Sequence, residues 1–400
     1  MLSRRRLLAG AAAGLAGLVL AACAAAVRSL VPSATSSVRP SPSPTPSPSA
    51  TPVASDPGPS LRERIGQMLV IGFRGATPEA ASATLRQVES LALGGVVLFD
   101  VDQLTGGPRN VESPEGLAVL VRSLREAATR FPLLVAIDQE GGRVARLDPD
   151  HGFPASRSAG ELGRLDDPAL TRSEAATMAG VLAEAGITLN LAPVVDLAVN
   201  PSNPIIAGIE RSYGTDPGRV IVHATAFIEA HHEAGIACAI KHFPGHGSST
   251  ADTHLGVVDV TETWSEVELE PFAALVDAGL AHAVLTAHVF NAHLDPDHPA
   301  TLSRATVTDL LRGRIGFTGA VLSDDLQMGA IRDAYGDEEA VALAIEAGID
   351  LLVVANQIVY DEGVAPRTVD LIEGLVRSGR ISEARIDESW QRIQRLKRGA

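Results

Sequence analysis

Residues 236–254 read Ile-Ala-Cys-Ala-Ile-Lys-His-Phe-Pro-Gly-His-Gly-Ser-Ser-Thr-Ala-Asp-Thr-His. The first five residues are apolar, as in a buried strand, and a proline and two glycines then prevent regular structure. Asp252 and His254 lie two positions apart, so an extended loop places both on one face, where the carboxylate can orient the imidazole. Charged groups on a glycine-broken loop after a buried strand indicate a functional site.

The same junction between a helix and a strand recurs along the chain. Glu or Asp, then Ala, Gly and an apolar residue, occurs four times. In each copy the glycine is expected to close a helix in the left-handed conformation, and the next residue starts a buried strand. The copies are Glu184–Ile187, Glu233–Ile236, Asp277–Leu280 and Glu346–Ile349.

Short apolar runs alternate with helical patterns from Leu61 onward, and two helices are predicted to start at Asp-Pro pairs, Asp167-Pro168 and Asp216-Pro217. This alternation predicts an α/β fold, a (β/α)8 TIM-type barrel. A doubly wound open sheet is the alternative, although no Gly-x-Gly-x-x-Gly follows the first strand. The predicted strands are Met68–Phe73, Gly95–Phe99, Leu133–Asp138, Thr188–Pro193, Ile236–Lys241, Ala283–His288, Ala320–Ser323 and Leu351–Ala355.

The first 60 residues have a different character. Residues 1–23 carry a basic start that resembles a twin-arginine signal, an apolar stretch, and Leu20-Ala21-Ala22-Cys23, which resembles a bacterial lipobox with Cys23 as the lipidated residue. An ordinary secretory signal is the alternative. Residues 24–60 are rich in Pro and Ser and are expected to form an extended linker. The folded domain is then residues 61–400, held outside the cytoplasmic membrane by a lipid anchor.

Composition narrows the possible partners. The net charge is −15, which argues against binding of nucleic acid and against membrane contact other than through the lipid anchor.

If Cys23 is lipidated, Cys238 remains as a small buried hydrophobic residue. His231 and His232 fall in a predicted helix and are expected to face solvent. The sequence does not define an oligomeric state, and a monomer is assumed.

Polar residues gather where the predicted strands end. Catalytic groups of a (β/α)8 barrel lie at the carboxyl ends of its strands, so these residues are expected to share one rim. Structural ion pairs would instead be scattered over helix faces. The residues are Asp138–Arg143 with Arg146, Pro193–Asp196, Arg211, Lys241 and His242, Asp252 and His254, Thr286–His288, and Ser323–Asp325.

These carboxylates with Arg, Lys and His donors suggest an enzyme acting on a hydroxyl-rich substrate. Glycosyl transfer needs a carboxylate near the anomeric carbon and a proton donor for the leaving oxygen. Asp324, held at a strand end, is the candidate nucleophile, and its neighbour Asp325 is expected to point to the other side. His254, backed by Asp252, suits the acid/base role because imidazole titrates near neutrality.

Six segments together resemble the β-N-acetylglucosaminidase branch of the family 3 glycoside hydrolases. The resemblance extends from about Leu61 to Lys397, and the segments occur in the family's order. They are Ile65–Met68, Asp138–Val144, Asn190–Asp196, Arg211–Gly214, Lys241–Gly247 with Asp252–His254, and Ser323–Leu326.

The resemblance implies a barrel, retention of anomeric configuration, Asp324 as nucleophile, and His254 with Asp252 as acid/base. It implies a single catalytic domain, without the second α/β sandwich domain that carries the acid in most of the wider family. The implied substrate is terminal β-linked N-acetylglucosamine, as in peptidoglycan fragments. Contacts to the sugar hydroxyls and acetamido group would come from Asp138, Arg146, Arg211, Lys241 and His242.

Other interpretations compete with this one. His242, His246, His254 and Asp252 could hold a metal, but the adjacent lysine would repel a cation, so neither a metal nor another cofactor is expected. Glu140 and Arg143 are interpreted as a structural ion pair. A phosphorylase, a broader β-glycosidase and a non-catalytic sugar-binding lipoprotein remain as alternatives for the function.

Overall fold

The computed structural model describes residues 58–399. Cys23, the predicted signal peptide and lipobox, and the predicted linker as far as residue 57 lie outside the described residues. Within residues 58–399, no helix has the length and apolar character needed to cross a membrane.

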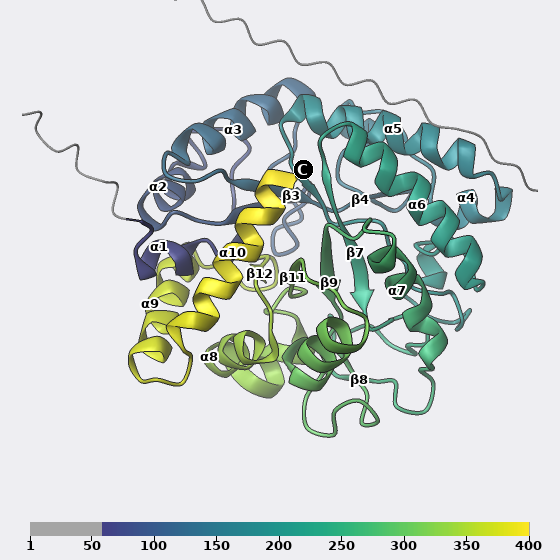
Figure 1. The fold of residues 1–400 in the computed structure, drawn as a ribbon. Helices are drawn as coiled ribbons and strands as arrows, with labels where there is room; N and C mark the ends of the chain where they lie inside the picture. The colour runs from purple at the N-terminus through teal and green to yellow at the C-terminus, as the bar shows by residue number, and fades with distance from the viewer. Residues whose placement is uncertain (1–57, 400) are drawn as a thin grey trace, which may run out of the picture. The chain divides into compact units, whose positions relative to one another are not determined.

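The described part of the chain contains a ring of eight parallel strands (Figure 1). Neighbouring strands pair in the order β11-β9-β7-β6-β3-β2-β1-β12. A parallel bridge between Leu322 and Leu351 joins the two ends of this order, and the amide of Ser323 donates to the Leu351 carbonyl at 2.9 Å. The strands are β1 (Leu69–Gly72), β2 (Gly95–Leu98), β3 (Leu134–Ile137), β6 (Leu189–Asn190), β7 (Ala237–Phe243), β9 (Ala283–Thr286), β11 (Ala320–Leu322) and β12 (Leu352–Val354).

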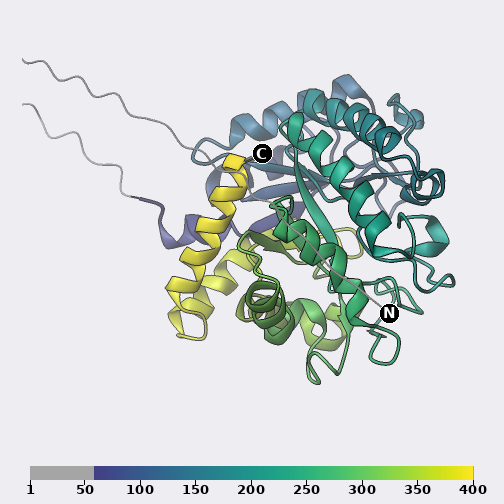
Figure 2. The same ribbon diagram turned by 45° about the vertical axis from the view of Figure 1, so that its right-hand side comes forward.

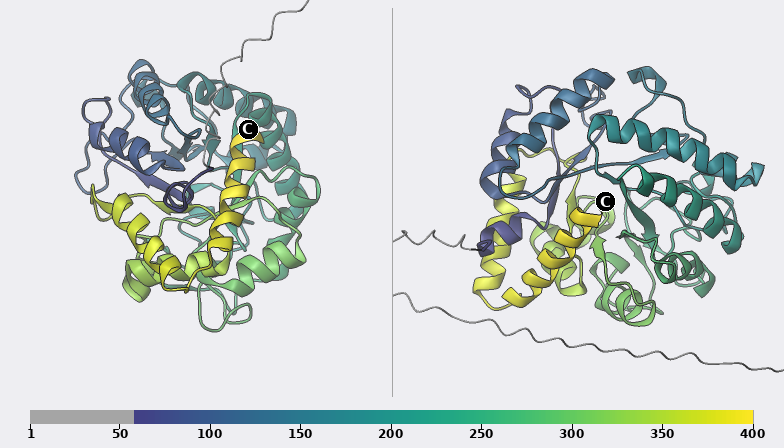
Figure 3. Two further views of the ribbon diagram at one scale, coloured as in Figure 1. Left: turned by 60° about the vertical axis from the view of Figure 1, so that its left-hand side comes forward. Right: turned by 45° about the horizontal axis from the view of Figure 1, so that its top comes forward.

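Helices surround this ring on its outer side (Figures 2 and 3). The prediction of a (β/α)8 barrel and all eight predicted strands are therefore confirmed, and the doubly wound alternative is wrong. The helices are α1 (Leu61–Gly66), α2 (Ser82–Leu91), α3 (Pro114–Ala127), α4 (Ala159–Leu165), α5 (Pro168–Ala185), α6 (Pro217–Glu233), α7 (Glu270–Asp277), the π-helix η5 (Ala305–Arg314), α8 (Gly329–Ala347), α9 (Val364–Arg377) and α10 (Glu383–Gly399).

Short elements lie in the connections between the main ones. Strands β4 and β5 pair in antiparallel orientation, and strands β8 and β10 pair in parallel orientation. These elements are β4 (Gln139–Gly141), β5 (Val144–Ala145), β8 (Val258–Asp259), β10 (Val289–Phe290) and the 3-10 turns η1 (Pro149–His151), η2 (Ala207–Ile209), η3 (Glu266–Leu269) and η4 (Ala300–Leu302).

The helix boundaries follow the predicted signals. Asp167 accepts hydrogen bonds from the amides of Ala169 and Leu170, and Asp216 accepts one from Arg219, so both cap helices that begin with proline. The repeated junctions behave as expected, because their glycines have φ angles of 78°, 75°, 70° and 118°. Left-handed φ angles of this kind favour glycine.

One histidine of helix α6 differs from the prediction. His231 is fully buried rather than exposed, with its Nδ1 2.9 Å from the Phe227 carbonyl and its Nε2 3.0 Å from the Asn190 amide nitrogen. Burial lowers the pKa of His231 to about 4. His232 is exposed, as predicted. The buried ring therefore ties α6 to β6, which a helical pattern alone does not reveal.

Helix α10 crosses the end of the barrel where the strands begin (Figure 1). Asp350, directly before β12, is fully buried. It accepts hydrogen bonds from Arg312 of η5 at 2.6 Å and, on α10, from Ser389 at 2.8 Å and Arg392 at 3.1 Å. Its Oδ2 also accepts from the Val321 amide at 3.1 Å. One carboxylate thus joins two strands to the last helix.

We expect Asp350→Ala to lower the free energy of unfolding by about 3–5 kcal/mol, because it leaves buried guanidinium groups without their counter-charge. Urea denaturation followed by circular dichroism would measure the change. Asp309→Ala is the matched control, since the Asp309 side chain is 64% exposed. Equal denaturation midpoints for the two variants would contradict this account of Asp350.

Candidate active site

A cavity of about 480 Å³ opens where the barrel strands end. All eight side chains that the sequence assigned to catalysis or to substrate binding line this one cavity. They come from the end of strand β7 and from the loops after β3, β6, β7 and β11, so the barrel gathers residues that are distant in the sequence. These side chains are Asp138, Arg146, Arg211, Lys241, His242, Asp252, His254 and Asp324.

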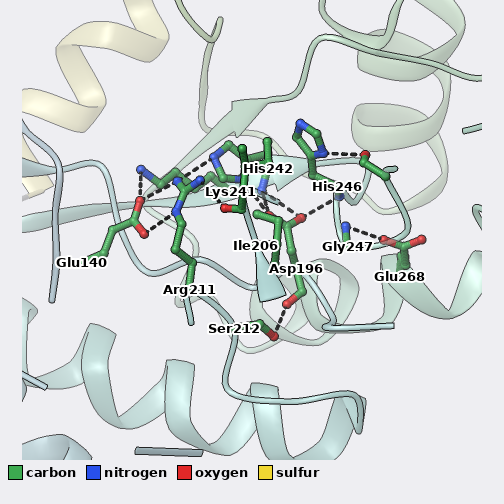
Figure 4. Close-up of polar contacts among 12 residues, drawn as sticks. Glu140, Asp196, Ile206, Arg211, Ser212, Lys241, His242, His246, Gly247 and Glu268 are labelled. Carbon is green, nitrogen blue, oxygen red and sulfur yellow. Dashed lines mark hydrogen bonds and ion pairs between the residues drawn. The ribbon is translucent and has the colours of Figure 1, made fainter. Parts of the chain in front are cut away.

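A buried carboxylate, Glu140, organises the cations on one side of the cavity (Figure 4). Both of its oxygens lie 2.7 Å from nitrogens of the Arg211 guanidinium, and Lys241 Nζ lies 2.6 Å from Oε1. Burial alone would raise the pKa of Glu140, but Arg211 and Lys241 outweigh it and hold the pKa well below its usual range. The predicted Glu140–Arg143 pair is wrong, because Arg143 is exposed and Arg211 takes its place.

Asp138 and Arg146 have fewer contacts with the protein than Glu140 and Arg211 have. Lys241 Nζ donates to Asp138 Oδ1 at 2.6 Å. Arg146 lies 3.5 Å from Asp100 and 3.8 Å from Asp138, and its buried Nε has no hydrogen-bond partner among the described residues. The unused donors of Arg146 and the free oxygen of Asp138 can therefore serve a polyhydroxylated ligand.

The ring of His242 is fixed by a carboxylate that the sequence analysis left without a role. Asp196 is fully buried, and its Oδ2 lies 2.6 Å from His242 Nδ1. The Asp196 carboxylate also accepts from the backbone amides of His242 at 3.2 Å and His246 at 2.8 Å. Nδ1 therefore carries the ring proton, and Nε2, 3.1 Å from Arg211 Nη2, accepts a hydrogen bond.

The loop after β7 packs closely against the loop after β6. A Cβ on Gly247 would lie 1.6 Å from the Leu197 carbonyl oxygen, so only glycine fits there. Glu268 Oε2 accepts from the amide of Gly247 at 3.0 Å (Figure 4) and from the amide of Ser248 at 3.3 Å. Burial raises the pKa of Glu268 to about 7, and its Oε1 has no hydrogen-bond partner in the described part.

The two aspartates after β11 are placed differently. Burial alone would raise the pKa of Asp324, but His288, His242 and His254 outweigh it and lower the pKa, so the carboxylate is ionised. Asp325 Oδ1 accepts from the backbone amides of Ala355 at 2.9 Å and of Gln327 at 3.1 Å, and burial raises its pKa to about 6. Both residues border the cavity, so the prediction that only Asp324 faces it is wrong.

Asp252 and His254 form the contact that their spacing predicts. His254 Nδ1 lies 2.6 Å from Asp252 Oδ1, which also accepts from the His254 amide at 2.9 Å. The His254 side chain is 50% exposed at the mouth of the cavity. The carboxylate fixes the tautomer and leaves Nε2 available for proton transfer.

The sequence analysis missed the residues that support the site from behind. Asp196, Glu268 and His246 are buried and position other groups. Asp196 had one available signal, its place after a predicted strand. The supporting role of Glu268 had none, because it lies in a turn that precedes α7.

A parallel (β/α)8 barrel with ionised carboxylates, cations and an Asp–His pair around one rim cavity is the arrangement of a TIM-barrel enzyme. Residues 60–396 match the model of the glycosyl hydrolase family 3 N terminal domain. The chain belongs to this family and is a glycoside hydrolase.

Similar proteins support the assignment. A beta-hexosaminidase of Tolumonas auensis is 40% identical over 269 residues, which are 66% of this chain and 76% of that protein. The structure of a family 3 beta-N-acetylglucosaminidase from Paenibacillus sp. matches with a TM-score of 0.78 and 34% identity, covering 85% of this chain and 62% of that one. A beta-N-acetylhexosaminidase from Beutenbergia cavernae matches with a TM-score of 0.76 and 34% identity, covering 84% and 98%.

The raised pKa of Glu268 makes the stability of the folded protein depend on pH. Its pKa is about 7 in the folded protein against an ordinary 4.5, so its stabilising contribution is complete below pH 4.5 and is lost as pH rises through 7. Glu268→Gln stays neutral and avoids this loss. We expect the stability of the variant relative to wild type to increase by on the order of 2 kcal/mol between pH 4.5 and pH 8. Thermal melts at both pH values would measure it, and a constant difference would contradict the prediction.

Proposed function

We propose that the protein is a retaining exo-β-N-acetylglucosaminidase that removes terminal β-linked N-acetylglucosamine. The main support is that an ionised Asp324 and the Asp252–His254 pair line the same cavity as a set of sugar-binding donors. The names of the beta-hexosaminidase of T. auensis and of the Paenibacillus enzyme point to the same substrate class.

Binding of the sugar would use the polar side of the cavity. Arg146 and Asp138 have free hydrogen-bonding capacity, and Lys241 is held between Asp138 and Glu140. Glu140 and Asp138 together compensate the charges of Arg211 and Lys241, so these cations can donate to hydroxyl or acetamido oxygens without requiring an anionic substrate.

The first chemical step would transfer the sugar to the enzyme. An Asp324 oxygen attacks the anomeric carbon and forms a covalent ester-like bond, while the bond from that carbon to the leaving oxygen breaks. His254, protonated for this step, gives its proton to the leaving oxygen. Asp252, 2.6 Å from Nδ1, stabilises the imidazolium before the transfer.

The second step would release the sugar with the roles reversed: His254 acts as a base and Asp324 as the leaving group. Neutral His254 takes a proton from water, whose oxygen attacks the anomeric carbon on the face opposite Asp324. The bond to Asp324 breaks and the carboxylate is regenerated. Two inversions give overall retention, and His254 returns to its protonated form ready for the next cycle.

The natural substrate and location follow from the first 60 residues together with the site. We propose that Cys23 is lipidated, that the protein acts outside the cytoplasmic membrane, and that its substrates are peptidoglycan-derived sugars. The support is the order of basic, apolar and small residues before Cys23 and the Pro/Ser-rich segment after it.

Asp324→Asn should reduce turnover of an aryl β-N-acetylglucosaminide by about 1000-fold or more, because an amide is a poor nucleophile. Asp309→Asn, with an exposed side chain, is the control for folding and should be unaffected. A 5-fluoro N-acetylglucosaminyl donor should label Asp324 of the wild type, as seen by mass spectrometry of peptides. Wild-type turnover by the variant, or a label elsewhere, would refute the assignment. Running the wild type with added phosphate identifies the acceptor, since a sugar 1-phosphate product would indicate a phosphorylase.

His254→Ala should slow hydrolysis of substrates with poor leaving groups by about 100- to 10,000-fold, because it removes proton donation. The loss should be smaller with dinitrophenyl leaving groups, which need no proton. Azide should restore turnover and give the β-glycosyl azide, detected by NMR. An equal loss for both kinds of leaving group would contradict the acid role.

Cys23→Ser should move the protein from the detergent phase to the aqueous phase in Triton X-114 partitioning of expressing cells. Lipidation at Cys23 is the physical reason, since acyl chains drive membrane partition. Asp324→Asn is the control and should remain in the detergent phase. A detergent-phase Cys23→Ser protein would show that the anchor lies elsewhere.

A further inference from the structure

Exposed aliphatic side chains concentrate around the mouth of the cavity. Nine large apolar side chains are exposed in the part of the chain that the structure describes, and six of them lie on loops that follow the carboxyl ends of barrel strands. The other three lie on helices α3, α4 and α6. Apolar groups exposed together on a soluble protein indicate a binding surface. The six are Val101, Leu104, Val199, Leu255, Val257 and Val359.

Five of these side chains belong to loops that contact one another along one side of the mouth. We call Val101, Leu104, Leu255, Val257 and Val359 the aliphatic rim. They are between 43% and 85% exposed.

Backbone and amide hydrogen bonds connect the loops of the aliphatic rim. The Gly329 amide donates to the His254 carbonyl at 3.3 Å, which joins the β7 loop to the start of α8. Gln327 Nε2 donates to the Val359 carbonyl at 3.4 Å, and Gln357 Nε2 donates to the Val101 carbonyl at 3.0 Å. The loops that carry the rim are therefore linked in series, from the β7 loop through the β11 and β12 loops to the β2 loop.

The aliphatic rim is also continuous with the cavity. Three rim residues directly follow residues that line the cavity, since Gln103 precedes Leu104, His254 precedes Leu255 and Ile358 precedes Val359. Leu255 follows His254 in the chain and is 85% exposed. A general acid must lie within hydrogen-bonding distance of the oxygen it protonates, so the leaving group of the substrate has to pass beside His254. Leu255 therefore lies close to the path of this leaving group.

We propose that the aliphatic rim is the leaving-group subsite and that it selects β-N-acetylglucosaminides whose aglycone presents an apolar face. This inference rests on the proposed function, because it uses His254 as the acid. The sugar that is released binds among charged donors, whereas the rim side chains offer no hydrogen-bonding group to hydroxyls. Aglycones with acyl, alkyl or alanyl methyl groups fit such a surface better than unsubstituted sugars.

The test is a series of alkyl β-N-acetylglucosaminides with methyl, ethyl, propyl and butyl aglycones. Their leaving oxygens have nearly equal basicity, so only the apolar area changes along the series. We expect kcat/KM of the wild type to rise by about two-fold per methylene, which corresponds to partial burial of each group. The rise should appear in kcat/KM, which covers the step that expels the aglycone, and not in the common hydrolysis of the glycosyl-enzyme.

Variants on two separate loops decide whether the aliphatic rim causes the effect. Leu255→Ser and Val359→Ser should each flatten the dependence on chain length. Both side chains are exposed, so folding is not at risk. Val119→Ser on α3 and Val222→Ser on α6 are matched controls, 45% and 50% exposed, and should keep the full dependence.

Each other outcome has a distinct meaning. If the wild type releases N-acetylglucosamine from all four glycosides with equal kcat/KM, the rim proposal fails and the proposed function stands. If it cleaves none of them and no aryl glycoside, the proposed function fails. The competing occupant is a lipid surface. Loss of sedimentation with phosphatidylglycerol vesicles in Leu255→Ser, with the chain-length dependence intact, would assign the rim to that surface and overturn the proposal.

Discussion

The pairing of one buried carboxylate with two cations underlies the whole substrate side of the cavity. Glu140 is nearly inaccessible to solvent, and an unpaired charge there would be strongly destabilising. Arg211 lies in the connection after β6 and Lys241 lies on β7, so Glu140 holds the connections after β3 and β6 against the end of β7. Asp196 does the same for His242 and the loop that follows it. The positions of Arg211, Lys241 and His242 therefore depend on carboxylates behind them.

The barrel and the residues that line the site could be predicted because both depend on local sequence patterns. A strand five residues long with apolar side chains can be recognised alone, and the glycine after each helix marks where the next strand begins. Parallel strands in a closed ring must all end on the same rim. Asp138, Lys241 and Asp324 could thus be brought together without knowing any contact between them, because each lies at or directly after the end of a predicted strand.

Contacts between residues on different loops and elements could not be predicted in the same way. Glu140 has Arg143 three positions away, yet it pairs with Arg211, which is 71 positions away in the sequence. The burial of His231 depends on Asn190 in the neighbouring strand. Both outcomes are set by the long connection after β6 and by the packing of α6, and neither leaves a local signature.

The contacts between Asp350 and α10, at the end of the barrel where the strands begin, bear on the order in which the parts of the domain fold. Asp350 obtains two of its charged or polar partners, Ser389 and Arg392, from the last helix of the described chain. During synthesis the strand that follows Asp350 emerges from the ribosome before α10 does. Until residues 383–392 arrive, the nascent chain offers Asp350 its partner Arg312 but neither Ser389 nor Arg392, so the base of the last strand gains these contacts only when α10 packs against it.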